Sequence, residues 1–349
     1  MREEQGSLDK RKAYILATVV YEYIATAEPV GSQTLTQKYH LGVSSATVRN
    51  EMAELEASGY LVQPHTSAGR VPSDAGYRTY VDQLMEPEEL GLEDRRRIRD
   101  ELHDASRELD DIIDSTTRLL GRLSNNLAFV TKPHQETQTF KHIQLIWLSP
   151  CTGVAIVVTS LGVTAQSLFE LTAEVRADEL TRFSNALNDR FANRPLRDVS
   201  ESDVVKAAEG VGAHEDLRGA VLSALQSARS SEQPTFASAG AQNLLDQPEF
   251  QDLRKLRSIL RIVEEQKTLY QIVADAMNAE TASVKIGHEL GSEELADLSV
   301  VTVPYRFGAN ALGMLSILGP RRMPYGRLVA LATGTAESLS QRLSDFEHT

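Results

Sequence analysis

Hydrophobic positions near the start of the chain recur every three or four residues in three successive stretches, 15–24, 32–39 and 44–55. This spacing predicts three amphipathic helices that share one core. A short turn containing Gly42 separates the second helix from the third, as in a helix-turn-helix. An apolar segment at 60–62 and a loop rich in Pro, Ser and Gly follow. The order of helix, helix, turn, helix and hairpin predicts a winged helix-turn-helix domain.

The third helix has two faces of different character. Val48, Met52 and Leu55 form its buried stripe, and an ordinary amphipathic surface helix would show the same stripe. The opposite face carries small and polar residues, among them an arginine and an asparagine that can donate paired hydrogen bonds to guanine and adenine edges. With the winged pattern around it, this face favours DNA binding. The residues predicted to contact DNA from this helix and its capping position are Ser44, Ser45, Thr47, Arg49 and Asn50.

The loop at 64–72 is the predicted wing. Its Thr66, Ser67 and Arg70 are expected to contact the DNA backbone or minor groove, with Arg70 near the tip of the loop. Lys38 adds a cation on the outward side of the second helix. Gly69 is expected to adopt a backbone conformation that is closed to residues with a Cβ.

Further along, the apolar pattern from 92 to 127 approaches a heptad repeat and predicts one long helix. This helix either lies on its own domain or pairs with a second copy. The stretch 142–169 comprises 28 residues and contains no Asp, Glu, Lys or Arg. It is long enough to cross a membrane, because about 20 apolar residues suffice for a transmembrane helix. Pro150, Gly153 and Gly162 interrupt the run, so three strands joined by turns are the better interpretation.

The rest of the chain alternates between helical and strand-like stretches. Residues 172–248 are mainly helical in pattern with one short strand, and a helical run extends from Leu253 to Met277. Strands are predicted at 283–287, 298–303 and 311–318, before a final helix at 324–343. Strands on both sides of a helical block suggest one mixed α+β domain interrupted by an insertion.

The charge of the chain is an objection to DNA binding. Its net charge is −13, and residues 1–85 carry eight Lys or Arg against ten Asp or Glu, which gives −2. A non-specific binder of polyanions would be basic. A sequence-specific dimer needs only a few cations on the face that meets the groove, so the acidic balance excludes loose binding rather than specific binding.

Catalytic and metal chemistry find little support in the residues. The single cysteine, Cys151, excludes an internal disulfide and a cysteine-based zinc site within one chain, and it is expected to be a buried thiol of the sheet. His65 beside Ser67 lies in a loop that is poorly suited to orienting a base. The acidic pairs Asp110–Asp111 and Glu201–Asp203 fall in solvated helical stretches. Residues 319–322 could bind an anion before the last helix, although a strand-to-helix turn explains them equally well.

Four ungapped motifs, 45–52, 64–73, 76–82 and 317–325, resemble the bacterial heat-inducible transcription repressor HrcA family, in the right order along essentially the whole chain. The resemblance implies an α+β multidomain protein. In it, a winged helix-turn-helix domain at 1–88 precedes a GAF-like α+β domain at 89–171 and 249–349. An inserted dimerising domain at 172–248 interrupts the GAF-like domain.

The resemblance also implies a function. A homodimer would repress transcription by binding double-stranded DNA at an inverted-repeat operator upstream of chaperone genes, and the chaperonin would modulate its activity. No enzyme activity, cofactor, metal or membrane is expected, and the absence of an apolar leader indicates the cytoplasm, with the protein on the nucleoid when bound to DNA. Two alternatives remain open, a ligand-sensing regulator gated through the GAF-like domain and an adaptor whose winged domain binds only protein.

Overall fold

The structure is a computed structural model, and it divides into two compact units. The first unit comprises Met1–Lys132, Phe236–Gly308 and Gly313–Thr349, and the second comprises Pro133–Thr235 with Ala309–Leu312. The structure describes residues 8–66, 68–104, 108–132, 139–160, 164–230, 236–250, 255, 261, 266–274, 276, 279, 281–307 and 311–347.

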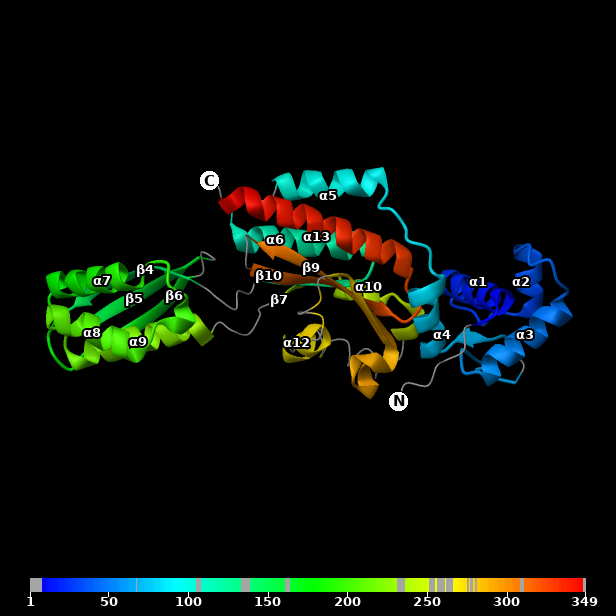
Figure 1. The fold of residues 1–349 in the computed structure, drawn as a ribbon, viewed down its shortest axis with the longest axis horizontal. Helices are drawn as coiled ribbons and strands as arrows, with labels where there is room; N and C mark the ends of the chain where they lie inside the picture. The colour runs from blue at the N-terminus through cyan, green and yellow to red at the C-terminus, as the bar shows by residue number, and fades with distance from the viewer. Residues whose placement is uncertain are drawn as a thin grey trace. The chain divides into compact units, whose positions relative to one another are not determined.

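The first unit begins with the predicted helices and a short β-hairpin (Figure 1). Asp9 caps the first helix by accepting from the backbone N–H groups of Arg11 and Lys12. The apolar stripes of the three helices meet in one core, in which Leu16, Leu35 and Val48 are fully buried. The elements are α1 Lys10–Thr26, α2 Ser32–Lys38, α3 Ser45–Ala57, β1 Leu61–Val62, β2 Val71–Pro72, α4 Asp74–Thr79 and a π-helical turn at Tyr80–Leu84.

A five-stranded sheet forms the centre of the first unit. Its strand order is β7-β3-β10-β9-β8, and β3 pairs antiparallel with both β7 and β10. The strands that follow the second unit in sequence therefore complete a sheet that begins before it. The strands are β3 Leu127–Thr131, β7 Phe236–Ala239, β8 Ser283–Ile286, β9 Leu298–Phe307 and β10 Ala311–Pro320.

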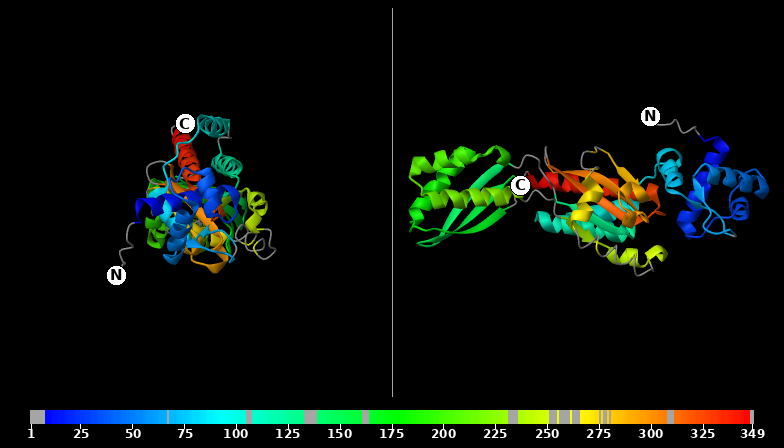
Figure 2. Two further views of the ribbon diagram at one scale, coloured as in Figure 1. Left: turned by 90° about the vertical axis from the view of Figure 1, so that its right-hand side faces the viewer. Right: turned by 90° about the horizontal axis from the view of Figure 1, so that it is seen from below.

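Helices cover both faces of this sheet (Figures 1 and 2). On one face lie α6 Leu109–Ser124 and α13 Tyr325–Glu347, and α5 Leu92–Asp104 packs on the outer side of these two helices. On the other lie α10 Ala241–Leu245 and α12 Gln266–Ala274, with short 3-10 turns at Pro248–Phe250, Gly287–Leu290 and Glu293–Leu295. Of the expected helical run from Leu253 to Met277, α12 is described, whereas both of these end residues lie outside the described part of the chain.

The single long helix expected from 92 to 127 is wrong. The structure has two helices there, and Glu108 is extended at the start of α6. Both pack on α13, and Glu101 of α5 accepts a hydrogen bond from Arg122 of α6 at 2.6 Å. The near-heptad pattern arises because each helix buries its own apolar stripe in the same domain, Ile98 and Leu102 in one and Ile112 and Leu119 in the other.

The second unit is a three-stranded antiparallel meander with helices on one face (Figure 1). The three strands predicted within 142–169 are confirmed. Phe140, Ile143 and Val157 project from the sheet into a core with Phe183 and Leu225 from the helices. The elements are β4 Phe140–Ser149, β5 Thr152–Thr159, β6 Thr164–Glu170, α7 Ala177–Phe191, a 3-10 turn at Leu196–Asp198, α8 Glu201–Val211 and α9 Glu215–Ser230.

The two units divide the chain differently from the domain bounds expected above. Strands β4–β6 belong to the second unit because their inner side chains pack on α7 and α9, whereas the expected bounds placed them with the central domain. Strand β7, expected within the insertion, pairs with β3 in the central sheet. Cys151 lies half-buried in the turn between β4 and β5 rather than inside the sheet.

Candidate nucleic-acid interface

Helix α3 presents one polar face to solvent. Val48, Met52 and Leu55 are at most 1% exposed and fix the opposite face in the core. Ala46, Arg49 and Asn50 are exposed, with Ala53 one turn further along. Small side chains flanking a guanidinium and an amide allow a helix to approach base edges closely.

The start of α3 is held by its cap. The Ser44 hydroxyl accepts from the backbone N–H of Thr47 at 3.2 Å and lies 3.0 Å from the Thr47 hydroxyl. Gly42, with φ of +68°, makes the turn from α2 in the left-handed region that favours glycine. Ser44 is exposed, and Ser45 and Thr47 are half-buried. These three hydroxyls therefore gather at the N-terminus of α3, where backbone N–H groups favour an anion such as phosphate.

Arg49 has no ion-pair partner among the described residues, although acids surround it in sequence. Glu51 and Glu54 instead face α1, where Lys12 lies 2.8 Å from Glu54 and 3.9 Å from Glu51. Arg11 adds a longer contact of 3.7 Å with Glu51. The sequence pattern did not indicate these pairs, because the partners are about forty positions apart. Their effect is to neutralise the acids of α3 and leave its guanidinium available.

Lys38 is engaged within the protein. Its ammonium donates to Glu22, a carboxylate of α1 that is only 5% exposed, and Tyr39 donates to the same carboxylate at 2.8 Å. The ammonium lowers the pKa of Glu22 below its usual 4.5, and desolvation raises the pKa of Tyr39 to about 12. Lys38 therefore joins α2 to α1, and its side chain, which is 53% exposed, retains part of its surface for another contact.

The wing is shaped by a glutamine whose role no local sequence pattern indicates. The Gln63 side-chain amide donates to the carbonyls of Thr66 at 3.2 Å and Ala68 at 2.9 Å, which closes the loop. Thr66 is exposed on this loop. Ser67 lies outside the described residues.

Arg70 lies at the base of the wing, which corrects the expectation of a position near its tip. Its backbone exchanges two hydrogen bonds with Val30, both 2.9 Å long. Its guanidinium lies 2.8 Å from Glu56 of α3, and the side chain is 15% exposed. Arg70 thus ties the wing to α3, and a DNA contact by it would have to share this guanidinium with Glu56.

Gly69 is needed for close approach and not for an unusual backbone angle, which corrects the reason given above. Its φ is not among the positive values of the chain. A Cβ at this position would lie 2.5 Å from both the carbonyl carbon and the oxygen of Val30. The wing can pair with the segment before α2 only because residue 69 has no side chain.

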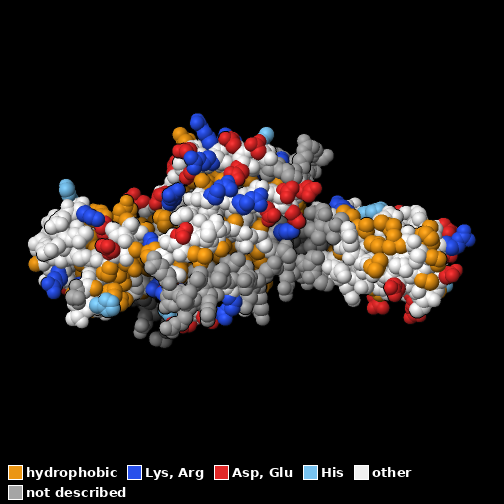
Figure 3. Space-filling model, turned by 180° about the vertical axis from the view of Figure 1, so that it is seen from behind, with side chains coloured by type: hydrophobic (Ala, Val, Ile, Leu, Met, Phe, Trp, Pro, Cys, Tyr) orange, Lys and Arg blue, Asp and Glu red, His pale blue; other side chains and the backbone are white. Residues whose placement is uncertain are grey.

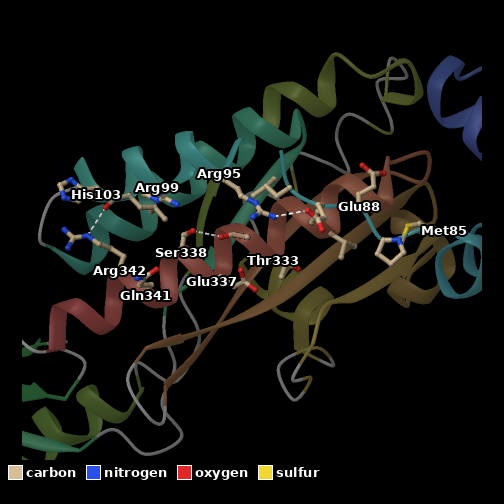
Figure 4. Close-up of a pocket in the computed structure, with 18 residues that line it drawn as sticks. Met85, Glu88, Arg95, Arg99, His103, Thr333, Glu337, Ser338, Gln341 and Arg342 are labelled. Carbon is tan, nitrogen blue, oxygen red and sulfur yellow. Dashed lines mark hydrogen bonds and ion pairs between the residues drawn. The ribbon is translucent and has the colours of Figure 1, made fainter. Parts of the chain in front are cut away.

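A cleft of about 940 Å³ lies between α5, α13 and the segment 85–90 (Figure 4). Arg95 and Arg99 project from α5 and Arg342 from α13. Three glutamates line the same cleft, and one of them, Glu89, is 3.9 Å from Arg95. Equal numbers of arginines and glutamates do not select a ligand by charge. The acidic lining residues are Glu88, Glu89 and Glu337.

Among the described residues, no group of three or more His, Cys, Asp or Glu side chains could hold a metal ion. In the same part of the chain, no helix is both long and apolar enough to cross a membrane. Residues 319–322 form the strand-to-helix turn that was the alternative to an anion site, and their arginines are engaged within the protein: Arg321 pairs with Asp74 and Asp297, and Arg322 with Glu249.

The capped helix has a small, polar outer face, its arginine is unpaired among the residues that the structure describes, and a wing follows it. This arrangement is typical of the class of winged helix-turn-helix transcription regulators. A family model described as "HrcA protein C terminal domain" matches residues 110–329. The chain is 37% identical over 337 residues to the heat-inducible transcription repressor HrcA of Pelotomaculum thermopropionicum, covering 96% of this chain and 97% of that protein. Identity to the same repressor of Carboxydothermus hydrogenoformans is also 37%, over 340 residues, with 97% and 98% covered.

The chain is also similar to a solved structure, described as a crystal structure of a hypothetical protein, with 23% sequence identity and a TM-score of 0.61. The match covers 97% of this chain and 100% of that chain, so the two proteins share a fold. The chain belongs to the HrcA family of heat-inducible transcription repressors, which are not enzymes.

Proposed function

We propose that the chain represses chaperone operons by binding an inverted-repeat operator as a homodimer, with one α3 helix in the major groove of each half-site. The observation that carries this proposal is the exposed face of α3, where Arg49 has no acidic partner among the described residues and lies beside Asn50. Direct readout of bases needs donors of this kind on a helix that fits the groove. Thr66 and Ser67 of the wing, the hydroxyls of Ser44, Ser45 and Thr47, and the part-engaged Lys38 and Arg70 would contact phosphates.

An uncovered sheet face supports the homodimer. Helices α7, α8 and α9 lie on one side of β4–β6, and hydrophobic side chains gather on the other side (Figure 3). Ile146, Val154 and Leu168 form one row across the three strands, and Leu168 is 65% exposed. An antiparallel sheet that faces water is normally polar on that side. A contiguous apolar patch there fits a second copy of the same surface.

The remaining parts of the proposal extend it by resemblance to the family. The central sheet with its helices is the GAF-like domain, the second unit is the dimerising insertion, and the chaperonin helps the repressor to reach its active form. The site of action is the cytoplasm, on the nucleoid.

One observation favours a second candidate, a regulator gated by a small molecule: the cleft drawn in Figure 4 is lined by the segment that leads from α4 to α5. A thermal-shift screen of small molecules would support this candidate through a ligand that both stabilises the protein and changes its affinity for DNA.

The test is a genomic pull-down with the full-length chain. Fragmented DNA from the source organism is captured by wild type, by Arg49→Ala and by Arg97→Ala, a matched loss of a cation from α5. We expect wild type and Arg97→Ala to enrich promoter fragments that share an inverted repeat upstream of chaperone genes, and Arg49→Ala to lose this enrichment. Failure of wild type to retain any fragment would contradict DNA binding and favour the adaptor alternative.

A further inference from the structure

Two motifs that lie almost 250 positions apart meet in the first unit. Asp74 and Tyr77 are in the helix that follows the wing, Arg321 is in the turn before the last helix, and Tyr325 is the first residue of that helix. Arg321 donates to the Asp74 carboxylate at 2.7 Å, and the rings of Tyr77 and Tyr325 meet edge to face with centroids 6.0 Å apart. Tyr77 is 1% exposed, so this contact is part of a packed interior and not a surface encounter.

The Asp74 carboxylate is the centre of a network. Beside Arg321, it accepts from the backbone N–H of His288 at 3.2 Å and lies 2.7 Å from His288 Nδ1. Gly287, with φ of +54°, leaves the space that the carboxylate occupies, since a Cβ there would lie 2.4 Å from an Asp74 oxygen. The turn at Gly287–Leu290 is therefore shaped around a residue of α4.

Arg78 lies four residues after Asp74 in the same helix, and it also binds the segment around Gly287–Leu290. Its Nε donates to Oε1 of Glu289 at 2.9 Å, and its Nη2 donates to Oε2 of the same carboxylate. Nη2 also donates to the backbone carbonyl of Val284 at 2.7 Å. Paired bonds between a guanidinium and a carboxylate fix orientation as well as distance. Asp74, Arg78, His288, Glu289 and Arg321 together are called the α4 joint below.

We propose that Asp74 and Arg78 are positioning residues that hold the winged domain in one orientation on the central domain, and that the α4 joint thereby sets the half-site spacing the repressor accepts. This inference rests on the proposed binding of an inverted repeat by a dimer. A winged domain on a flexible tether would reach half-sites at many spacings, because a flexible linker behaves as a random coil and samples many end-to-end distances. A winged domain fixed by two adjacent side chains meets only half-sites whose separation and rotation match.

The experiment compares three DNA duplexes by fluorescence anisotropy: one half-site, the inverted repeat with its natural spacer, and the repeat with five extra base pairs, about half a turn of B-DNA. Full-length wild type, Arg78→Glu, Arg78→Gln, Glu289→Arg and the double exchange Arg78→Glu/Glu289→Arg are measured. Arg97→Glu, whose partner Glu93 lies within α5, is the control with the same change in charge.

We expect wild type and Arg97→Glu to prefer the natural spacer by about tenfold or more. The single exchanges and Arg78→Gln should bind the half-site as wild type does and lose most of this preference, and the double exchange should recover part of it. Unchanged half-site affinity shows that the winged domain is folded in each variant.

A wild-type preference retained in the three single variants would overturn the positioning role and leave the proposed function standing. Absence of half-site and full-site binding by wild type would overturn the proposed function and the positioning role together.

Discussion

At the scale of residues, the polar face of α3 is flanked by cations of α2 and the wing that are held by carboxylates within the protein. Ser44 caps the helix and Val48, Met52 and Leu55 are buried, as their spacing predicted. Lys38 and Arg70 pair with Glu22 and Glu56, which lie 16 and 14 positions away. Periodicity shows which face of a helix is polar, whereas ion pairs depend on how helices pack. DNA contacts by these residues remain predictions.

The first prediction concerns Arg49. Arg49→Ala should cost about 1–3 kcal/mol of operator binding if the guanidinium reads a base. If it contacts phosphate instead, all sequences should be weakened alike and the salt dependence should become shallower. Anisotropy titrations at several salt concentrations separate the two cases. Operator affinity equal to that of wild type would exclude Arg49 from the interface.

The second prediction concerns Lys38. Lys38→Ala removes one donor from the buried Glu22 carboxylate and should lower the local stability of α1 and α2 by about 1–3 kcal/mol. Because Lys38 lowers the pKa of Glu22, the stabilisation is complete above the usual value of 4.5 and is lost as pH falls through the lowered pKa. Amide exchange of α1 and α2 should therefore be less sensitive to acid in the variant. Lys10→Ala is the control, and equal acid sensitivity in wild type and Lys38→Ala would refute the role.

At the scale of elements, strand patterns were more informative than helix lengths. The run 142–169 gave three strands because charged residues are absent and turn residues recur, two signals that are local. The pattern at 92–127 suggested one helix where two pack on α13, because two amphipathic helices in series have the same period as one. The residues of the α4 joint carried no signal of their own, since the two motifs meet only through tertiary packing.

The third prediction concerns the attachment of the wing. Gly69→Val would place a side chain against the backbone of Val30 and should separate the wing from α1 and α2. Both operator affinity and the protection of the Val30–Arg70 hydrogen bonds in amide exchange should fall. Gly91→Val is the matched control, because a Cβ at Gly91 meets no atom within 4 Å. Normal protection of Arg70 in Gly69→Val would show that the wing accommodates the side chain.

At the scale of the whole molecule, the order of strands predicted an interrupted mixed domain, and the structure has that topology. What the sequence did not indicate was where the interruption begins, because alternating apolar positions in β4–β6 suit any sheet. Pairing alone distinguishes the central sheet from the second one, and pairing partners such as Val130 and Leu315 are far apart in the chain.

The fourth prediction concerns assembly. Leu168→Glu introduces a charge into the apolar row of the second unit and should convert dimers to monomers that keep half-site binding and lose avidity of about 10²–10⁴ for the full repeat. Leu92→Glu makes the same change at a site that is 77% exposed on α5, the rival location of the contact. Light scattering that found monomers for Leu92→Glu and dimers for Leu168→Glu would move the interface to α5.

The pairing of β3 with β7 and β10 has a consequence for the order in which a newly made chain can fold. The winged domain and most of the second unit are each continuous in sequence, so each can fold soon after it leaves the ribosome. Strand β3 is made early, yet Phe129 and Leu127 remain without their partners Ser316 and Leu318 until nearly the whole chain has been synthesised. During that interval the edge of β3 that will pair with β10 is uncovered, and an uncovered apolar strand edge favours aggregation, so a chain stopped before β10 should aggregate more readily than the full chain.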